Sequence, residues 1–266
     1  MKNKILILLF ASAILVVSCR KEQRDTLGSS ISTDNNTAEN LFSDMFKVVD
    51  EVSLNTAGIR EDLIGCIDTI IVDTTSNPKT VLIDFGNDEC IGNDGRIRKG
   101  KLNITYTGRY REEGTVISIM PENYTVNGNL IQGLKTIENL GPNSSGQLHY
   151  AVTVNGTVTA PGYAWNISWS ANRIRTWVEG QNTGTPWDDV YEITGSGSGI
   201  NRNGVSYTSS ITQALRAKLN CAWLVSGSIT LQPQDHETRY IDFGNGACDS
   251  GFTVTVDGET YQLGSD

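Results

Sequence analysis

Residues 80–90 read T-V-L-I-D-F-G-N-D-E-C and residues 238–248 read T-R-Y-I-D-F-G-N-G-A-C. Both stretches contain Ile-Asp-Phe-Gly-Asn, followed three residues later by a cysteine. In both copies an apolar run, a polar turn and a further cysteine come before this motif. Five identical residues in the same framework of cysteines indicate an internal duplication, with units near 66–102 and 221–263.

Each unit has the order cysteine, strand, turn, strand, cysteine. The two cysteines of a unit then lie at the open end of one hairpin, where the distance between strands allows a disulfide. We therefore predict the disulfides Cys66–Cys90 and Cys221–Cys248. Four cysteines allow three connectivities, and an exchange of partners between the two units remains the alternative.

The rest of the chain favours strands. Apolar and polar residues alternate over 102–107 and 148–154, which is typical of half-buried strands. Asn-Gly or Asp-Gly pairs, which favour two-residue hairpins, occur at Asn127-Gly128, Asn155-Gly156, Asn203-Gly204 and Asp257-Gly258. These features predict an all-β, predominantly antiparallel domain of about fourteen strands, built as a sandwich or a curled meander because large sheets curl or split. The Gly- and Ser-rich region 181–210 is expected to form long loops.

One amphipathic helix is expected before the strands. Apolar residues recur at helical spacing at Leu41, Phe42, Met45, Phe46, Val49 and Val52. Asn36 and Glu39 resemble a capping box, which places the start of the helix near residue 37. We expect this helix to pack one face on the sheet. The polar stretch 19–36 carries too few apolar residues to fold and is expected to be a flexible tether.

The N-terminus has the features of an export signal. Lys2 and Lys4 precede an apolar run over 5–17, which is shorter than the about 20 residues a membrane-spanning helix needs. The run ends V-V-S-C, which resembles the lipobox of bacterial lipoproteins. Residues 1–18 are therefore interpreted as a lipoprotein signal peptide, and Cys19 as the residue that carries acyl chains such as palmitate. The alternatives are an ordinary signal with a coincidental cysteine, or a buried helix.

These features predict a cell-envelope protein whose single domain, 37–266, is held at the membrane by lipid. Arg20 stands where enteric lipoproteins of the inner membrane carry Asp, so outer-membrane sorting is permitted. The net charge is −9, and removal of the two lysines in residues 1–18 makes it −11. Such an acidic domain is a poor partner for nucleic acid. The cysteines would pair in an oxidising compartment.

Two groups of residues are candidates for ligand contacts. Trp187, Asp188 and Asp189 could contact a sugar, or an aspartate could serve a glycosidase, although neighbouring strand residues face opposite ways. A solvated strand edge is the favoured interpretation of this group. Trp165 and Trp169 share a strand face with Tyr163 and Ile167, and this stripe is interpreted as core in preference to a glycan platform. An envelope protein is the other conceivable partner.

The sequence favours neither metal nor cofactor chemistry. Its two histidines, His149 and His236, lack neighbours that would form a catalytic triad or a zinc site. Asn87, Asp88, Asn93 and Asp94 are conceivable calcium ligands, but their spacing matches no EF-hand. We therefore expect no cofactor, no metal and no catalytic residue.

Several longer strings resemble a family of uncharacterised lipoproteins of Bacteroidota. They are R-K-G-K-L-N-I-T-Y-T-G-R-Y-R-E-E-G-T-V at 98–116, W-V-E-G-Q-N-T at 177–183, W-D-D-V-Y-E-I-T-G-S-G-S-G-I-N-R-N-G-V-S-Y at 187–207 and I-D-F-G-N-G-A-C-D at 241–249. The resemblance implies an envelope location and supplies no activity.

The leading hypothesis is a non-enzymatic envelope protein with a binding or structural role. The alternatives are a polysaccharide-acting enzyme that uses Asp188 or Asp189, a glycan-binding module, and a lipid carrier with a wide apolar cavity inside a curled sheet.

Overall fold

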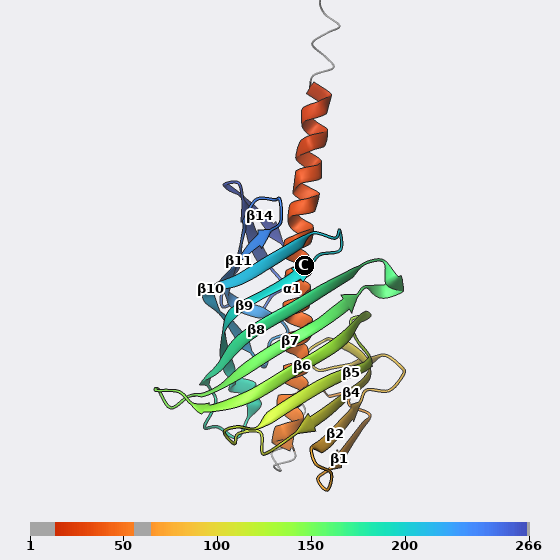
Figure 1. Ribbon diagram of the computed structural model, residues 1–266, viewed down its shortest axis with the longest axis vertical. Coiled ribbons are helices and arrows are strands. Elements are labelled where there is room, and N and C mark those ends of the chain that lie inside the picture. The colour runs from red at the N-terminus through yellow and green to blue at the C-terminus, as the bar shows by residue number, and fades with distance from the viewer. Residues whose placement is uncertain (1–13, 56–64, 265–266) are drawn as a thin grey trace, which may run out of the picture.

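The computed structural model describes residues 14–55 and 65–264, and the side chains of the helix at residues 30–50 and 52. It contains one helix, α1 (Ile14–Asn55), and one sheet of fourteen strands (Figure 1). The strands are β1 (Thr69–Asp73), β2 (Lys79–Asp84), β3 (Cys90–Ile91), β4 (Ile97–Tyr106), β5 (Val116–Val126), β6 (Asn129–Pro142), β7 (Leu148–Thr159), β8 (Asn166–Glu179), β9 (Val190–Ile200), β10 (Ser206–Lys218), β11 (Leu224–Pro233), β12 (Arg239–Asn245), β13 (Phe252–Val256) and β14 (Glu259–Leu263). Two short 3-10 helices, η1 (Pro161–Tyr163) and η2 (Pro186–Asp188), interrupt the strands.

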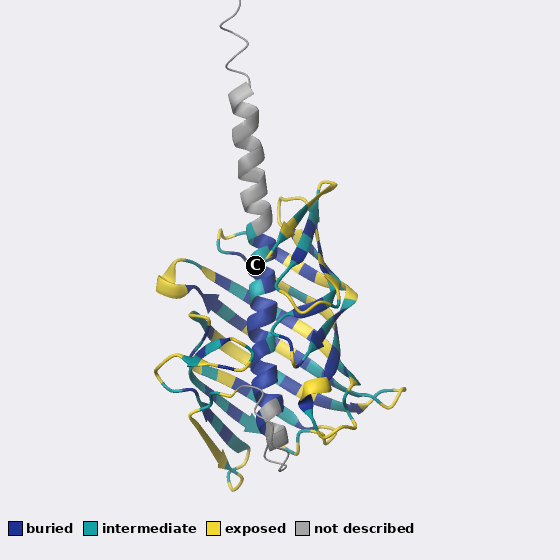
Figure 2. Ribbon diagram, turned by 180° about the vertical axis from the view of Figure 1, so that it is seen from behind, coloured by how far each residue is buried: buried dark blue, intermediate teal, exposed yellow. Residues whose placement is uncertain are grey.

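The sheet is a meander that curls around α1. Each strand pairs antiparallel with its neighbours in the order β1-β2-β4-β5-β6-β7-β8-β9-β10-β11-β12-β13-β14, and β3 pairs with β4 beside this path. The sheet is not closed, and β1 and β14 are its two edges. The view from behind shows α1 running along the hollow side of the curled sheet (Figure 2). The prediction of an all-β, antiparallel fold with fourteen strands and one helix near the N-terminus is confirmed.

Some of the predicted turns are present and one is wrong. Both residues of Asn127-Gly128 and of Asp257-Gly258 have positive φ, between 50° and 77°, as a two-residue hairpin turn requires. Asn155-Gly156 instead lies inside β7, at the point where the ring of Phe42 approaches the sheet. Within the expected loop region 181–210, β9 and the start of β10 are regular strands, because their neighbours on both sides supply ladder hydrogen bonds that override a weak strand propensity.

The helix differs from its prediction in where it begins and in how it packs. It begins at Ile14, so the expected flexible tether over 19–36 is wrong: these residues are helical, and residues 30–36 are mostly buried. Asn36 does not cap the helix, and its side chain accepts a hydrogen bond from Asn40 Nδ2 at 2.7 Å. Between residues 31 and 50, the positions that are not buried are Thr33, Thr37 and Ser43. The curled sheet therefore covers the polar face of the helix as well as the apolar face.

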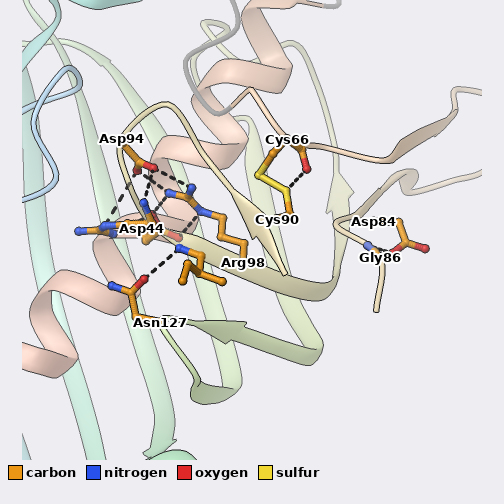
Figure 3. Close-up of a disulfide and its surroundings, with 10 residues drawn as sticks. Asp44, Cys66, Asp84, Gly86, Cys90, Asp94, Arg98 and Asn127 are labelled. Carbon is orange, nitrogen blue, oxygen red and sulfur yellow. Dashed lines mark hydrogen bonds and ion pairs between the residues drawn. A yellow bond between two sulfur atoms is a disulfide. The ribbon is translucent and has the colours of Figure 1, made fainter. Parts of the chain in front are cut away.

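The two duplicated units form the two ends of the sheet. Disulfides join Cys66 to Cys90 and Cys221 to Cys248, with Cα–Cα distances of 5.6 and 5.8 Å, as predicted. The first disulfide lies beside β3 (Figure 3). In each unit the aspartate of Ile-Asp-Phe-Gly accepts a hydrogen bond from the backbone N–H of the glycine two residues later, at 2.9 Å in the first unit and 2.7 Å in the second. The repeated motif is thus a repeated strand ending.

Candidate functional sites

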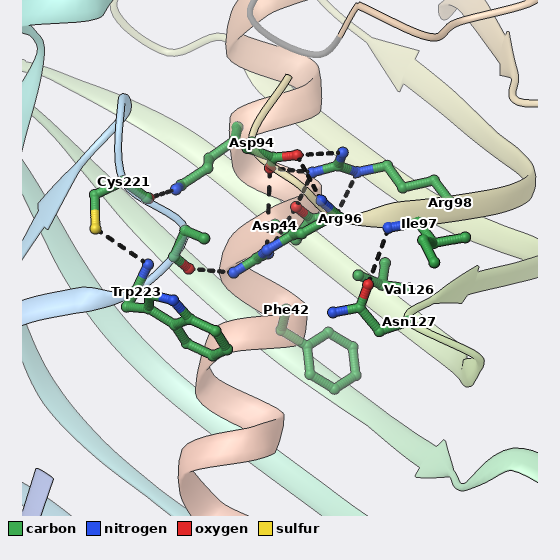
Figure 4. A network of polar contacts seen from close by, with 12 residues as sticks. Phe42, Asp44, Asp94, Arg96, Ile97, Arg98, Val126, Asn127, Cys221 and Trp223 are labelled. Atoms are coloured by element: carbon green, nitrogen blue, oxygen red, sulfur yellow. Dashed lines mark hydrogen bonds and ion pairs between the residues drawn. The ribbon is translucent and has the colours of Figure 1, made fainter. Parts of the chain in front are cut away.

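A buried ion-pair network joins α1 to the first duplicated unit. The carboxylate of Asp44 accepts hydrogen bonds from Arg96 Nη1 at 2.7 Å, from Arg98 Nε at 3.1 Å and Nη2 at 2.5 Å, and from Tyr124 OH at 2.8 Å. Arg98 also pairs with Asp94, at 2.6 Å (Figure 4). The two guanidinium groups and the hydroxyl hold the pKa of Asp44 far below its usual value in spite of complete burial.

The same network reaches the second duplicated unit. Arg96 Nη2 donates to the backbone carbonyl of Ala222, and Lys47 Nζ donates to that of Cys221 (Figure 4). The guanidinium of Arg96 also lies 5.9 Å from the centre of the Trp223 ring. These contacts hold the two ends of the sheet to the same turns of α1, so the network stabilises the curl.

Asp94 therefore has a structural role in place of the conceivable calcium role. Within residues 14–55 and 65–264 no cluster of three or more His, Cys, Asp or Glu side chains is arranged to hold a metal ion. The sequence pattern was misleading because carboxylates that serve an ion pair and carboxylates that ligate calcium look alike along a chain.

A second buried cluster surrounds Asp50. Tyr191 OH donates to Asp50 Oδ1 at 3.3 Å, and the Arg175 guanidinium lies 4.2 Å from the centre of the Tyr191 ring. The ring of Tyr110 stacks on that of Tyr150, at 5.7 Å between centroids. Burial raises the pKa of Asp50. This cluster was not visible in the sequence, since its members come from α1, the β4–β5 loop, β7, β8 and β9.

Asp189 belongs to the edge of this cluster, and its expected solvation is wrong. The residue is 1% exposed and accepts a hydrogen bond from Trp177 Nε1 at 3.2 Å. Burial, and then the charge of Asp50, raise the pKa of Asp189 to about 8. Asp188 is exposed in η2 and accepts from Thr183 Oγ1 at 2.9 Å. Neither aspartate lines either of the two hollows described below.

The tryptophans do not form a common platform. Trp169 is 2% exposed and stacks on Phe42 of α1 at 5.4 Å, which confirms the interpretation as core. Trp165 precedes β8, is partly buried and lies 4.3 Å from the Arg202 guanidinium. Trp187 is 36% exposed in η2, away from both. Tyr163 is exposed in η1 and so does not share the strand face with the others.

The edge strand β1 exposes apolar residues on both faces. Ile70, Ile71 and Val72 are 40, 55 and 42% exposed. Ile70 and Val72 lie opposite the buried Ile83 and Val81 of β2. The apolar inner face of the sheet therefore extends onto β1, where its side chains are exposed. Among residues 14–55 and 65–264 no strand pairs with the outer side of β1, and such an edge is a template for another strand.

A broad hollow lies over the outer face of β8 to β11. It has a volume of about 560 Å³, and its lining combines hydroxyl and amide side chains with Trp169, Ile200 and Pro233. Its lining includes Ser168, Ser170, Ser198, Ser206, Thr208, Gln232 and Gln234, and no charged residue. Trp169 faces α1 on the other side of β8, so its neighbours Ser168 and Ser170 face outward.

Comparison with known proteins gives no relative: no protein family, no curated protein and no solved structure matches the chain. In the part of the chain that the structure describes, α1 has no stretch that is both long and apolar enough to cross a membrane.

Proposed function

We propose that this protein is a lipid-anchored envelope protein whose folded domain binds an extended segment of a partner protein along the edge strand β1. The observation that carries the proposal is the run of exposed apolar residues on β1, a sheet edge with which no other described strand pairs. Natural proteins usually protect such edges with charges, bulges or cover. A strand added to this edge would pair with its backbone and cover its side chains.

The anchor is Cys19, on the lipobox-like sequence, in line with the resemblance to Bacteroidota lipoproteins and with outer-membrane sorting. Two disulfides support maturation in an oxidising compartment. The helix projects beyond the sheet at the end where β14 lies, and β1 lies at the other end (Figure 1). A helix from Cys19 to Ser30 spans about 16 Å at 1.5 Å per residue, which replaces the flexible tether with a stiff spacer.

Metabolic labelling tests the anchor. Wild-type protein is expected to incorporate labelled palmitate and to fractionate with membranes, and Cys19→Ser is expected to lose both properties. Lys21→Ser, two residues away, serves as the matched control and should keep them. Labelled Cys19→Ser protein would overturn the anchor.

Charge selects the kind of segment that fits β1. Asp68 precedes the strand and Asp73 is its last residue. Antiparallel pairing of two copies centred on Ile71 would bring Asp73 of each copy to the Asp68 end of the other. Like charges placed across strands are destabilising. The favoured occupant is therefore a different protein, with β-branched residues between basic flanks.

Synthetic peptides test this fit. A peptide with alternating Val and Thr and lysine flanks is expected to slow the exchange of backbone amide hydrogens in β1 and to bind more tightly than a peptide with glutamate flanks, by tenfold or more. Val72→Lys should abolish this binding. Tyr240→Lys, at an exposed position of β12, is the control. Equal binding of both peptides, or full binding by Val72→Lys, would overturn the proposal.

A second candidate function is the binding of a neutral glycan in the outer hollow. Its volume lies within the range of roughly 300–1,000 Å³ that is usual for ligand sites, and its uncharged hydroxyl and amide lining suits a sugar chain. Ser198→Trp would fill the hollow and is expected to abolish glycan retention, while Thr194→Trp on the same strand should leave it intact. Glycan retention that survives Ser198→Trp would reject this candidate.

The lipid-carrier alternative has less support. The curled sheet holds α1 where a carrier would need its cavity. The cavity beside α1 has about 30 Å³ and is lined by four charged residues together with apolar ones. An acyl chain does not fit there.

A further inference from the structure

Three basic side chains converge on the cavity between α1 and the sheet. Its lining includes Lys135 of β6 and Arg173 and Arg175 of β8, with Glu39 of α1 as the one acidic residue. All three basic residues are buried, between 3 and 6% exposed. The strand register places them on the inner face of neighbouring strands, since Val152 and Val154 of β7 lie opposite Arg173 and Lys135 and line the same cavity.

Existing partners leave part of this positive charge uncompensated. Arg173 forms two hydrogen bonds to Glu39, at 3.2 and 2.7 Å, and these occupy the only carboxylate of the cavity. Lys135 Nζ donates to the carbonyl of Phe42 at 2.6 Å. Arg175 lies 3.7 Å from the centre of the Phe46 ring, a contact that satisfies no N–H group.

Buried donor atoms on both arginines lack a partner among the described residues. They are Nη1 of Arg173 and Nε and Nη2 of Arg175. A buried, unpaired donor on a charged group is costly, more so than on a neutral one. Two arginines and a lysine of the lining stand against one glutamate. Asp50, which acts on Arg175 from outside the lining, has a pKa that burial raises. The positive charge that remains is what an anion would neutralise.

We propose that this cavity binds a small inorganic anion, of which chloride is the representative, held by Lys135, Arg173 and Arg175. A cavity of about 30 Å³ holds two water molecules at roughly 10–15 Å³ each. A monatomic halide fits this space, and tetrahedral sulfate or phosphate does not. The rings of Phe42 and Phe46 and the valines of β7 form the apolar walls.

Protonation of Lys135 is linked to this binding. Burial, and then the charge of Arg175, lower the pKa of Lys135 to about 7, while Glu39 and Asp44 act in the opposite direction. A bound anion stabilises the charged ammonium, so anion affinity is highest below pH 7 and decreases as the lysine loses its proton.

Unfolding by urea at constant ionic strength tests the site, with chloride exchanged against the bulkier methanesulfonate. Chloride is expected to raise the urea midpoint in a saturable manner, as a ligand of the native state does, and more at pH 6 than at pH 8.5. Lys135→Met and Arg175→Met should each lose the chloride-specific increase. Arg216→Gln, in an exposed ion pair with Glu179, should keep it.

Bromide anomalous scattering gives a second readout that needs no variant to fold. Crystals grown in bromide are expected to show a peak between Lys135, Arg173 and Arg175. The absence of this peak, identical midpoints in chloride and methanesulfonate, or an unchanged chloride effect in Lys135→Met would each overturn the proposal.

Discussion

Arg98 of β4 and Asp44 of α1 form an ion pair in which Nη2 lies 2.5 Å from Oδ1 and both side chains are completely buried. Fifty-four positions separate the two residues. Buried pairs of this kind lose hydration on both sides, and they persist only when hydrogen bonds satisfy the remaining donors and acceptors. Arg96, Asp94 and Tyr124 complete these hydrogen bonds.

Removal of the Asp44 charge is expected to be strongly destabilising. Asp44→Asn leaves two buried guanidinium groups facing a neutral amide, and breaking a buried pair on one side costs about 3–5 kcal/mol. Urea unfolding monitored by tryptophan fluorescence measures the loss. The matched control is Glu179→Gln, which breaks the exposed pair with Arg216 and should cost at most about 1 kcal/mol. Equal effects of the two variants would contradict the structural role of the network.

The raised pKa of Asp189 predicts that the stability of the protein depends on pH. Its pKa is raised from 3.8 to about 8 in the folded protein, so between these values the folded state keeps a proton that the unfolded state releases. Stability therefore falls as the pH rises from about 4 to about 8. Asp189→Asn should remove this contribution, so its stability relative to wild type increases across that window. Asp188→Asn, at an exposed position, is the control and should follow the wild-type plot of stability against pH. If the plot for Asp189→Asn also ran parallel to that of wild type, the Asp189 carboxyl group would be ionised in the folded protein.

The close packing around Gly156, where the helix approaches the sheet, predicts that a larger side chain at this position is destabilising. A Cβ at this position would lie 2.6 Å from Phe42 Cζ and 2.3 Å from the carbonyl oxygen of Gln132. Overpacking of this kind costs about 1–3 kcal/mol, so Gly156→Ala should lower the free energy of unfolding by that amount. Gly184→Ala is the control, because a Cβ there meets no atom within 4 Å. Gly156→Ala with wild-type stability would argue against the close approach of Phe42.

Loss of either disulfide is expected to weaken the domain. Replacing Cys66 and Cys90, or Cys221 and Cys248, by serine should each cost about 2–5 kcal/mol. The two pairs should cost similar amounts, since they enclose loops of similar length, with separations of 24 and 27 residues. Peptide mapping without reduction accompanies the unfolding measurements. A peptide that links Cys66 to Cys221 would contradict the pairing.

Local patterns determined much of the fold. Alternation of apolar and polar residues gave the strands, because side chains of a strand alternate between faces whatever its partners are. The repeated Ile-Asp-Phe-Gly-Asn motif predicted both disulfides, because each pair closes one hairpin and needs only local geometry. Asn155-Gly156 shows the limit of such patterns: the pair has turn chemistry, yet Phe42 and the neighbouring strands place it inside β7.

The polar side of the helix could not be assigned in this way. Asp34, Glu39 and Asp44 resemble a solvated face, and the polar composition before residue 37 resembles a tether. Their partners are Arg202 of the β9–β10 turn, Arg173 of β8 and Arg98 of β4. The first pair is separated by 168 positions and the second by 134. No short window of sequence contains both members of such a pair.

By itself, the sequence determined most of the strands, the presence of one helix, the duplication, the cysteine pairs and the prediction of a lipidated Cys19. Only the tertiary structure decided that the open sheet curls around the helix, that Asp189 is buried, and that Lys135, Arg173 and Arg175 meet at one cavity. The physical reason is that strand periodicity and hairpin closure are local properties of the backbone. The burial of a charged side chain depends instead on whether the fold places an oppositely charged side chain, from a distant part of the sequence, next to it.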